Sequence, residues 1–303
     1  MDERAALALL ADELEAAGDD AAIVDELVVT TDMLHERTDF PAGTSRYTAG
    51  WRAVGASLSD VAAMGAEATA AVAAYAAPEF DREELRAFVR GASDVCELVD
   101  AEYVGGDLDG HQEFTVTTTA IGRTDEPVRR SGARPGDRVC VTGTLGRSAA
   151  ALALFERAGE RECTDKRDDE RRRANELFRF EPRIEAGLAL APHATAMMDS
   201  SDGLARSLHQ LGEASDCGFE IDSAAIPVDD AVRAVTDTDE AALERATTFG
   251  EDFELVVTVP ADEVDVVREQ TSVPISEIGS VVERERGITL DGAELEDRGY
   301  THL

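Results

Sequence analysis

The sequence predicts a mixed α/β (α+β) protein of two domains. Strand-like and helix-like segments alternate along all 303 residues, and a chain of this length is typical of two domains. Near the middle, the segment RRSGARPGDRVCVTG is punctuated by Gly and Pro and begins a new strand at residues 139–142. We therefore expect a first domain of residues 1–136 and a second of residues 137–303.

The first half is expected to combine long helices with strands. Residues 3–17 have helical periodicity, and GDDAAIVDELVVTTDML then changes to an apolar, β-branched pattern typical of strands. Residues 45–64 and 81–100 form two further helical patterns, the second clearly amphipathic. The remaining strands are predicted at ATAAVAAYAAP, AEYVGGD and EFTVTTTAIG. The alanines of the first of these also permit a helix.

The second half repeats this mixture. Helices are expected from about residue 147, over residues 167–180 and from Gly203. Strands are expected at ATAMMD and at residues 218–222, 253–259 and 275–282. Four methionines in apolar surroundings are expected in the core: Met33, Met64, Met197 and Met198.

The composition is strongly acidic. The chain carries 64 acidic and 29 basic residues, a formal net charge of −35, and Lys166 is its only lysine. Such a surface repels phosphate backbones and anionic lipids, so we expect neither nucleic acid nor membrane as a partner. Acid excess with almost no lysine is typical of adaptation to a salt-saturated interior, where salt screens self-repulsion.

The sequence also predicts a soluble, cytoplasmic protein. No segment approaches the roughly 20 apolar residues of a membrane helix. The first residues, MDERAALALLADELEAAGDD, are acidic and lack the basic start of a signal peptide.

Acidic side chains recur at the ends of apolar segments, beside Gly, Ser or Thr. The segments are GDDAA, VVTTDML, SLSDVAAMG, VGGDLDG, MMDSSDGLA and FGEDFELVV. Each aspartate alone could close a turn or cap a helix, and for Asp202 an N-cap is as good an explanation as a ligand role. Several carboxylates bordering apolar strands would repel one another unless arginine or a metal neutralised them.

The residue types favour magnesium and a nucleotide. The side chains in these segments provide oxygen ligands. The four cysteines are scattered, and the five histidines are not spaced as in known metal-binding motifs. Oxygen ligands suit Mg²⁺, which completes its coordination with water and substrate phosphates. The sequence has no Walker motif, no dinucleotide fingerprint after a strand and no protein-kinase lysine. Phosphate charge would therefore be neutralised by metal, arginine and backbone amides.

Seven segments together resemble the thiamine-monophosphate kinase family, whose superfamily includes aminoimidazole ribonucleotide synthetase. They are GDDAAIV, TTDML, SLSDVAAMGA, VGGD, RSGARPGDRVCVTGTLGRSAA, DSSDGLARSL and GEDFEL, and the resemblance extends from about residue 18 to about residue 282. The resemblance implies the two-domain aminoimidazole ribonucleotide synthetase-like fold. In that fold an N-terminal sheet domain dimerises through its sheet, and a C-terminal α/β domain closes over the nucleotide.

The resemblance also implies an activity: phosphorylation of thiamine monophosphate to thiamine diphosphate by direct transfer from ATP, with several Mg²⁺ ions, in a homodimer. No catalytic side chain is implied, because the attacking phosphate oxygen is already ionised and needs no general base. The implied metal ligands are Asp20, Thr30, Thr31, Asp32, Asp60, Asp107, Asp199 and Asp202. The implied ATP contacts are Gly106, Asp107, Arg147 and Ser201, and Glu251 is implied at the acceptor substrate.

The chain departs from the family pattern at the acceptor. Asp39 stands where the family usually has a substrate-contacting histidine, and Asp297 where it has a substrate-packing tryptophan. Either Phe40 or Tyr300 compensates for these changes, or the acceptor differs. Two alternatives therefore stand beside the kinase hypothesis: a related ATP-dependent enzyme acting on another acceptor, and a non-catalytic nucleotide-binding dimer.

Overall fold

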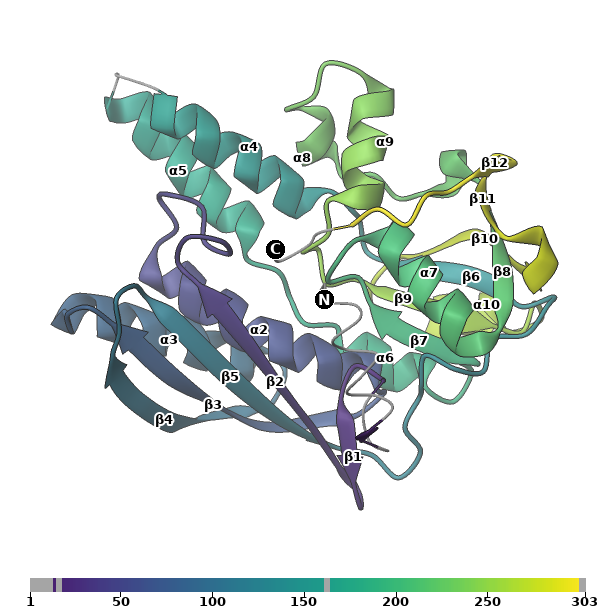
Figure 1. Cartoon of the computed structure of the whole chain (residues 1–303), viewed down its shortest axis with the longest axis horizontal. Coiled ribbons are helices and arrows are strands. Elements are labelled where there is room, and N and C mark those ends of the chain that lie inside the picture. The colour runs from purple at the N-terminus through teal and green to yellow at the C-terminus, as the bar shows by residue number, and fades with distance from the viewer. Residues whose placement is uncertain (1–12, 15–17, 161–163, 300–303) are drawn as a thin grey trace.

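The computed structural model describes residues 13–14, 18–160 and 164–299 and contains two β-sheets, one in each half of the chain (Figure 1). The helix expected at residues 3–17 falls almost wholly outside these ranges.

The first sheet has five strands in the order β1-β2-β5-β3-β4. The strands are β1 (Ala22–Val24), β2 (Leu27–His35), β3 (Glu67–Ala77), β4 (Glu102–Gly110) and β5 (Thr115–Arg123). Neighbours are antiparallel except β3 and β4, which are parallel. One face packs on two helices, α2 (Arg46–Ala63) and α3 (Arg82–Leu98). All five strands agree with the sequence-based prediction to within a few residues. The segment ATAAVAAYAAP is confirmed as a strand and not a helix.

Side-chain caps and two glycines fix the helices of this half. The side chains of Ser45 and Asp81 accept hydrogen bonds from the first turns of α2 and α3, which satisfies N–H groups that a helix leaves free. The two helices cross at very close range. A Cβ on Gly50 would lie 2.2 Å from the carbonyl oxygen of Phe88, and one on Gly91 would lie 1.9 Å from that of Tyr47. Only glycine therefore permits this crossing.

The other face of the first sheet has apolar side chains that are exposed to solvent. Side chains alternate between faces along a strand, and Thr30 and Asp32 of β2 bond to residues of α2. Met33 therefore points to the opposite face, where it is 56% exposed, and Val72 of β3 is 36% exposed. The prediction of Met33 in the core was wrong, while Met64, Met197 and Met198 are buried.

The second sheet has seven strands in the order β12-β11-β8-β10-β6-β9-β7. They are β6 (Arg138–Thr142), β7 (Ala196–Asp199), β8 (Cys217–Ile221), β9 (Leu255–Val259), β10 (Ile275–Glu283), β11 (Ile288–Leu290) and β12 (Ala293–Glu294). The helices of this half are α4 (Arg147–Glu160), α5 (Thr164–Phe178), α6 (Ile184–Leu190), α7 (Leu204–Ser215), α8 (Asp230–Arg233), α9 (Asp239–Thr248) and α10 (Val264–Gln270). The short elements α6, α8, α10, β11 and β12 and the helix α9 were not predicted.

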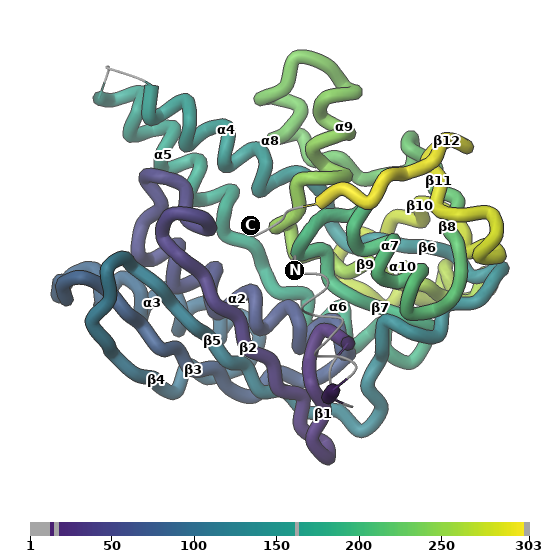
Figure 2. Tube along the Cα trace, in the orientation of Figure 1, coloured from purple at the N-terminus to yellow at the C-terminus, as the bar shows by residue number. Residues whose placement is uncertain are grey.

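Helix α2 lies between the two sheets and joins their cores. Leu58 of α2 and Met64, which directly follows this helix, belong to one buried cluster with Met197 of β7 and Val257 of β9. Figure 2 shows the chain leaving α5 and running beside α2 down to α6. The C-terminal part of α2 therefore faces the end of β7, and residues at both places can meet. Of the helices in the described ranges, none is both long and apolar enough to cross a bilayer.

Candidate functional site

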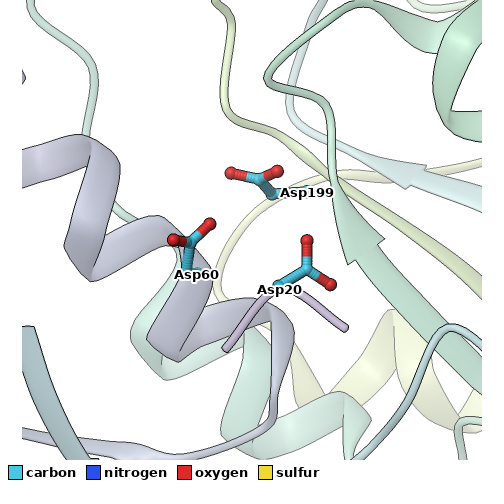
Figure 3. Close-up of side chains that lie close together, drawn as sticks. All are labelled: Asp20, Asp60 and Asp199. Carbon is cyan, nitrogen blue, oxygen red and sulfur yellow. The ribbon is translucent and has the colours of Figure 1, made fainter. Parts of the chain in front are cut away.

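Three aspartates from distant parts of the chain meet where the two halves join (Figure 3). Asp20 lies just before β1, Asp60 lies in the last turn of α2, and Asp199 is the last residue of β7. A carboxylate oxygen from each lies within 4.8 Å of the others. Their side chains point toward one another, and Asp199 is only 1% exposed. The structure thus brings together three of the residues predicted from the sequence as metal ligands.

The ionised forms of these carboxylates are destabilised by burial and by mutual repulsion. Burial raises the pKa of Asp199 to about 7, and Asp20 adds to this effect. Burial also raises the pKa of Asp60 well above its usual range, with further contributions from Asp32 and Asp199. Both shifts have the cause expected of buried like charges. A cation placed among these oxygens would relieve both the burial cost and the repulsion.

One cation of the protein already lies at the cluster. Arg130 contacts Asp20 through two hydrogen bonds, Nη2 to Oδ1 at 2.7 Å and Nε to Oδ2 at 3.2 Å. Burial alone would lower the pKa of Arg130, but Asp20, Asp199 and Asp60 raise it above the usual value. The sequence did not point to Arg130 as a site residue, because it lies within the Gly- and Pro-rich junction. The only signal was its position as the first residue of the family-like segment RSGARPGD.

The donor set still fits a metal ion. One guanidinium faces several carboxylates, and neither oxygen of Asp199 accepts a well-formed hydrogen bond within the described part of the chain. Such buried acceptors require a partner. Within the described residues the group that could hold a metal consists of aspartates, and carboxylate oxygens suit Mg²⁺.

Two more of the predicted ligands face the cluster. The Thr30 hydroxyl donates to Asp60 Oδ2 at 2.5 Å, and Asp32 Oδ2 accepts from the Ser57 hydroxyl at 2.8 Å. Both side chains leave β2 on the side of α2. Asp32 also contributes to the raised pKa of Asp60.

Thr31 and Asp107 are not brought to the cluster within one chain. Thr31 follows Thr30 on β2, so its side chain leaves the sheet on the opposite face, where it is exposed. Asp107 lies on β4, which is separated from β2 by β5 and β3. Asp107 pairs with Ala74, one residue from the inward-facing Ala73, so it shares the outer face with Thr31.

Gly106 is required by the sheet and borders a groove. A Cβ at this position would lie 1.7 Å from the carbonyl oxygen of Ala73, so no other residue fits between β4 and β3. Gly106 and Asp107 line a groove of about 690 Å³ whose walls include Tyr75, Phe88 and Val89. This groove is predominantly apolar.

Ser201 and Asp202 lie in the loop between β7 and α7, directly after Asp199. The N-cap position of α7 is occupied by Gly203. The alternative that Asp202 is the N-cap residue was therefore wrong. The carbonyl oxygen of Ser201 accepts a hydrogen bond from the backbone N–H of Glu251 at 2.6 Å, which joins the two loops that were predicted to contact ATP and acceptor.

The two acids of GEDFEL have separate roles. Glu251 forms an ion pair with Arg52 of α2. Asp252 accepts hydrogen bonds from the backbone N–H groups of Gly146 and Ser148, at the start of α4. Burial raises the pKa of Asp252 to about 7 against the effect of these two bonds. Asp252 therefore fixes the start of a helix, and Glu251 remains nearer to the interface of the two halves.

The remaining predicted residues lie outside the aspartate cluster. Arg147 begins α4 and lines another cavity, of about 320 Å³, beside Trp51 and Arg179. The guanidinium at the cluster belongs instead to Arg130. Asp39 is buried at the turn after β2, where Oδ2 accepts from the His35 N–H at 2.7 Å. Asp297 Oδ1 accepts from Arg206 Nε of α7 at 2.5 Å.

The whole chain is similar to known proteins. Residues 18–124 match the N-terminal domain of AIR synthase related protein, and residues 134–291 match its C-terminal domain. The chain is 60% identical over 302 residues to the thiamine-monophosphate kinase of Halobacterium salinarum, covering all of both chains. It is 40% identical to that of Methanospirillum hungatei, covering 95% of this chain and 94% of the relative.

A solved structure described as AaThiL complexed with AMPPCP and TMP shares the fold. It has a TM-score of 0.86 and 29% identity, and the match covers 100% of this chain and 97% of that one.

Proposed function

Because the chain belongs to the AIR synthase related family and matches thiamine-monophosphate kinases over its whole length, we propose that it phosphorylates thiamine monophosphate with ATP. It is a thiamine-phosphate kinase of the type found in halophiles, an enzyme that adds a phosphoryl group to a phosphate acceptor. The observation that best supports this function is the cluster of Asp20, Asp60 and Asp199, which lies where the two halves that match the family meet. We assign these domains to residues 1–136 and 137–303.

Magnesium is the proposed metal. The oxygens of Asp20, Asp60 and Asp199, with Asp32 and Thr30 beside them, would hold it, and Asp202 would add a ligand from the next loop. Magnesium supplies neutralisation and alignment of the phosphate groups. The cluster supports this proposal because its buried acids need more positive charge than Arg130 provides.

The residues of the chain supply positioning and not covalent chemistry. The attacking atom is an ionised phosphate oxygen of the acceptor, so no side chain has to remove a proton. Arg130 lies close enough to the cluster to offset phosphate charge as well as that of Asp20. The Ser201 loop and the Gly106–Asp107 segment are the proposed contacts of ATP, and Arg147 remains a proposed contact.

We further propose a homodimer formed through the outer face of the first sheet. The exposed side chains of Met33 and Val72 support this dimer, because an exposed apolar sheet face is typical of an interaction surface. In an isologous dimer the same face meets its copy. Thr31 and Asp107 lie on this face, so they would serve a site that includes both protomers.

The proposed acceptor residues are Asp39, Glu251 and Asp297. Glu251 has the strongest support, since its loop is bonded to the Ser201 loop. The cytoplasm remains the proposed location, because an acid excess of −35 suits a salt-saturated interior.

The first test is a product assay. The purified protein is incubated in concentrated KCl with Mg²⁺, ATP and thiamine monophosphate, and thiamine diphosphate and ADP are measured together. Equal amounts of both are expected. The Asp60→Asn variant is expected to lose turnover with little change in its unfolding temperature. The control is Asp265→Asn, whose side chain is 92% exposed on α10. ADP without thiamine diphosphate, or full activity of Asp60→Asn, would contradict the proposal.

A further inference from the structure

Arg52 is a buried arginine on α2 that the kinase chemistry described above does not use. It is 2% exposed and forms an ion pair with Glu251, which belongs to the other half of the chain. A buried charge of this kind is costly unless the protein surrounds it with acceptors. Its contacts therefore indicate what it holds in place.

The guanidinium of Arg52 contacts three separate segments of the second half. Nη2 donates to both the side-chain carboxylate and, at 3.4 Å, the carbonyl oxygen of Glu251. Nη1 donates to the carbonyl oxygen of Phe178 at 2.5 Å and to the Ser148 hydroxyl at 3.4 Å. One side chain of the first half thus ties together the end of α5, the start of α4 and the Glu251 loop.

Aromatic rings complete the enclosure. The guanidinium carbon of Arg52 lies 3.6 Å from the ring centroid of Phe178 and 5.4 Å from those of Phe180 and Phe253. The latter two rings stack on each other at 4.2 Å. Such stacking favours a planar guanidinium over an ammonium group. The site therefore suits arginine better than lysine.

The loop held by Arg52 needs external support. Gly250, Glu251 and Phe253 all have positive φ, +84°, +63° and +54°. Two of these are residues with side chains, for which this conformation is unfavourable. The same loop is bonded to the Ser201 carbonyl through the Glu251 N–H. Any change at Arg52 is therefore transmitted to the acceptor loop.

We propose that Arg52 is a positioning residue for the acceptor substrate: it holds the Glu251 loop in its strained conformation by a double contact and so sets the affinity for the acceptor. This inference rests on the proposed function for the identity of the acceptor. The positioning itself rests on the contacts of Arg52 alone.

The kinetic test compares Arg52→Gln, Arg52→Lys and Glu251→Gln with wild type in concentrated KCl. Arg52→Gln is expected to raise the KM for thiamine monophosphate about tenfold or more, and to change the KM for ATP less than about twofold. Arg52→Lys keeps the charge but cannot reach Glu251 and Phe178 at once, so it is expected to restore only part of the affinity. The double variant of Arg52→Gln and Glu251→Gln is expected to be no worse than the poorer single variant.

The matched control is Arg46→Gln. Arg46 lies on the same helix, forms ion pairs with Glu36 and Glu84 and stacks on Phe114, yet touches no part of the Glu251 loop. Its KM values are expected to match wild type.

Hydrogen exchange gives a second readout that does not depend on activity. In Arg52→Lys the amides of residues 250–254 are expected to exchange faster than in wild type, while those of β7 and β9 keep their protection. If Arg52→Gln does not fold, Arg52→Lys and Glu251→Gln provide the same comparison.

The two possible failures are distinguishable. A wild-type protein that binds ATP but forms no thiamine diphosphate overturns the proposed function. Wild-type turnover together with an unchanged acceptor KM and unchanged loop exchange in the Arg52 variants overturns the positioning role alone. So does a double variant whose losses simply multiply, because Arg52 would then not act through Glu251.

Discussion

The Asp199→Asn variant is expected to be inactive but more stable than wild type in the absence of metal. Burial, with the nearby carboxylates of Asp20 and Asp32, raises the pKa of Asp199 from 3.8 to about 7. Asn keeps the size and polarity of the side chain and removes the charge. The comparison therefore isolates the repulsion that a metal ion is proposed to relieve.

The size of the effect follows from the shift. Three pKa units at about 1.4 kcal/mol each correspond to about 4 kcal/mol of cost for the ionised carboxylate in the folded protein. The folded state holds the proton more tightly than the unfolded chain. Metal-free wild type therefore loses stability as pH rises from 3.8 toward 7, and keeps it below that range. The variant is expected to gain up to about 4 kcal/mol over wild type at pH 8 and almost nothing at pH 4.

The assay is denaturant unfolding in concentrated KCl at several pH values, with EDTA and again with excess Mg²⁺. With EDTA the difference in unfolding free energy is expected to grow with pH. With Mg²⁺ wild type is expected to be stabilised by ligand binding, and the variant much less. A difference that does not change with pH, or equal stabilisation of both proteins by Mg²⁺, would refute the view of the cluster as a repulsive metal site.

Three further changes test other parts of the structure. Asp252→Ala removes the acceptor for two N–H groups at the start of α4 and is expected to lower the free energy of unfolding by about 1–2 kcal/mol in a denaturant titration; an unchanged midpoint would contradict its capping role. Met33→Asp with Val72→Asp places charges on the outer face of the first sheet and is expected to convert a dimer to monomer by light scattering; a dimer of unchanged mass would place the interface elsewhere. Arg130→Gln leaves Asp20 buried without its partner and is expected to destabilise the metal-free protein by about 3 kcal/mol, with partial recovery in Mg²⁺, in thermal unfolding scans; equal losses with and without Mg²⁺ would separate Arg130 from the cluster.

The sequence was most informative where chemistry and periodicity agree. Asp60 within SLSDVAAMG and Asp199 after AMM stand out because apolar residues surround them, and burial then forces them to share a cation. The family resemblance implied Thr30 and Thr31 together as ligands. A strand separates consecutive side chains onto opposite faces, so only one of the two can point to α2.

Other features depend on contacts that no local pattern records. Arg130 meets Asp20 across 110 positions, and its own neighbours suggest only a linker. A strand was predicted to begin at Phe253, after the acids of FGEDFELVV. The positive φ of Phe253 delays β9 to Leu255, and the buried Glu254 instead accepts two hydrogen bonds from Arg183. Tertiary contacts thus override the local preference in the loop that matters most for the acceptor.

The division of the three aspartates between the two halves of the chain has a consequence for protein synthesis. Asp20 and Asp60 leave the ribosome long before Asp199, so a nascent or truncated chain carries only two of the three carboxylates. Such a chain is expected to bind metal and nucleotide poorly and to consume no ATP. Activity is therefore expected only once Asp199 has been made and the second sheet has packed against α2.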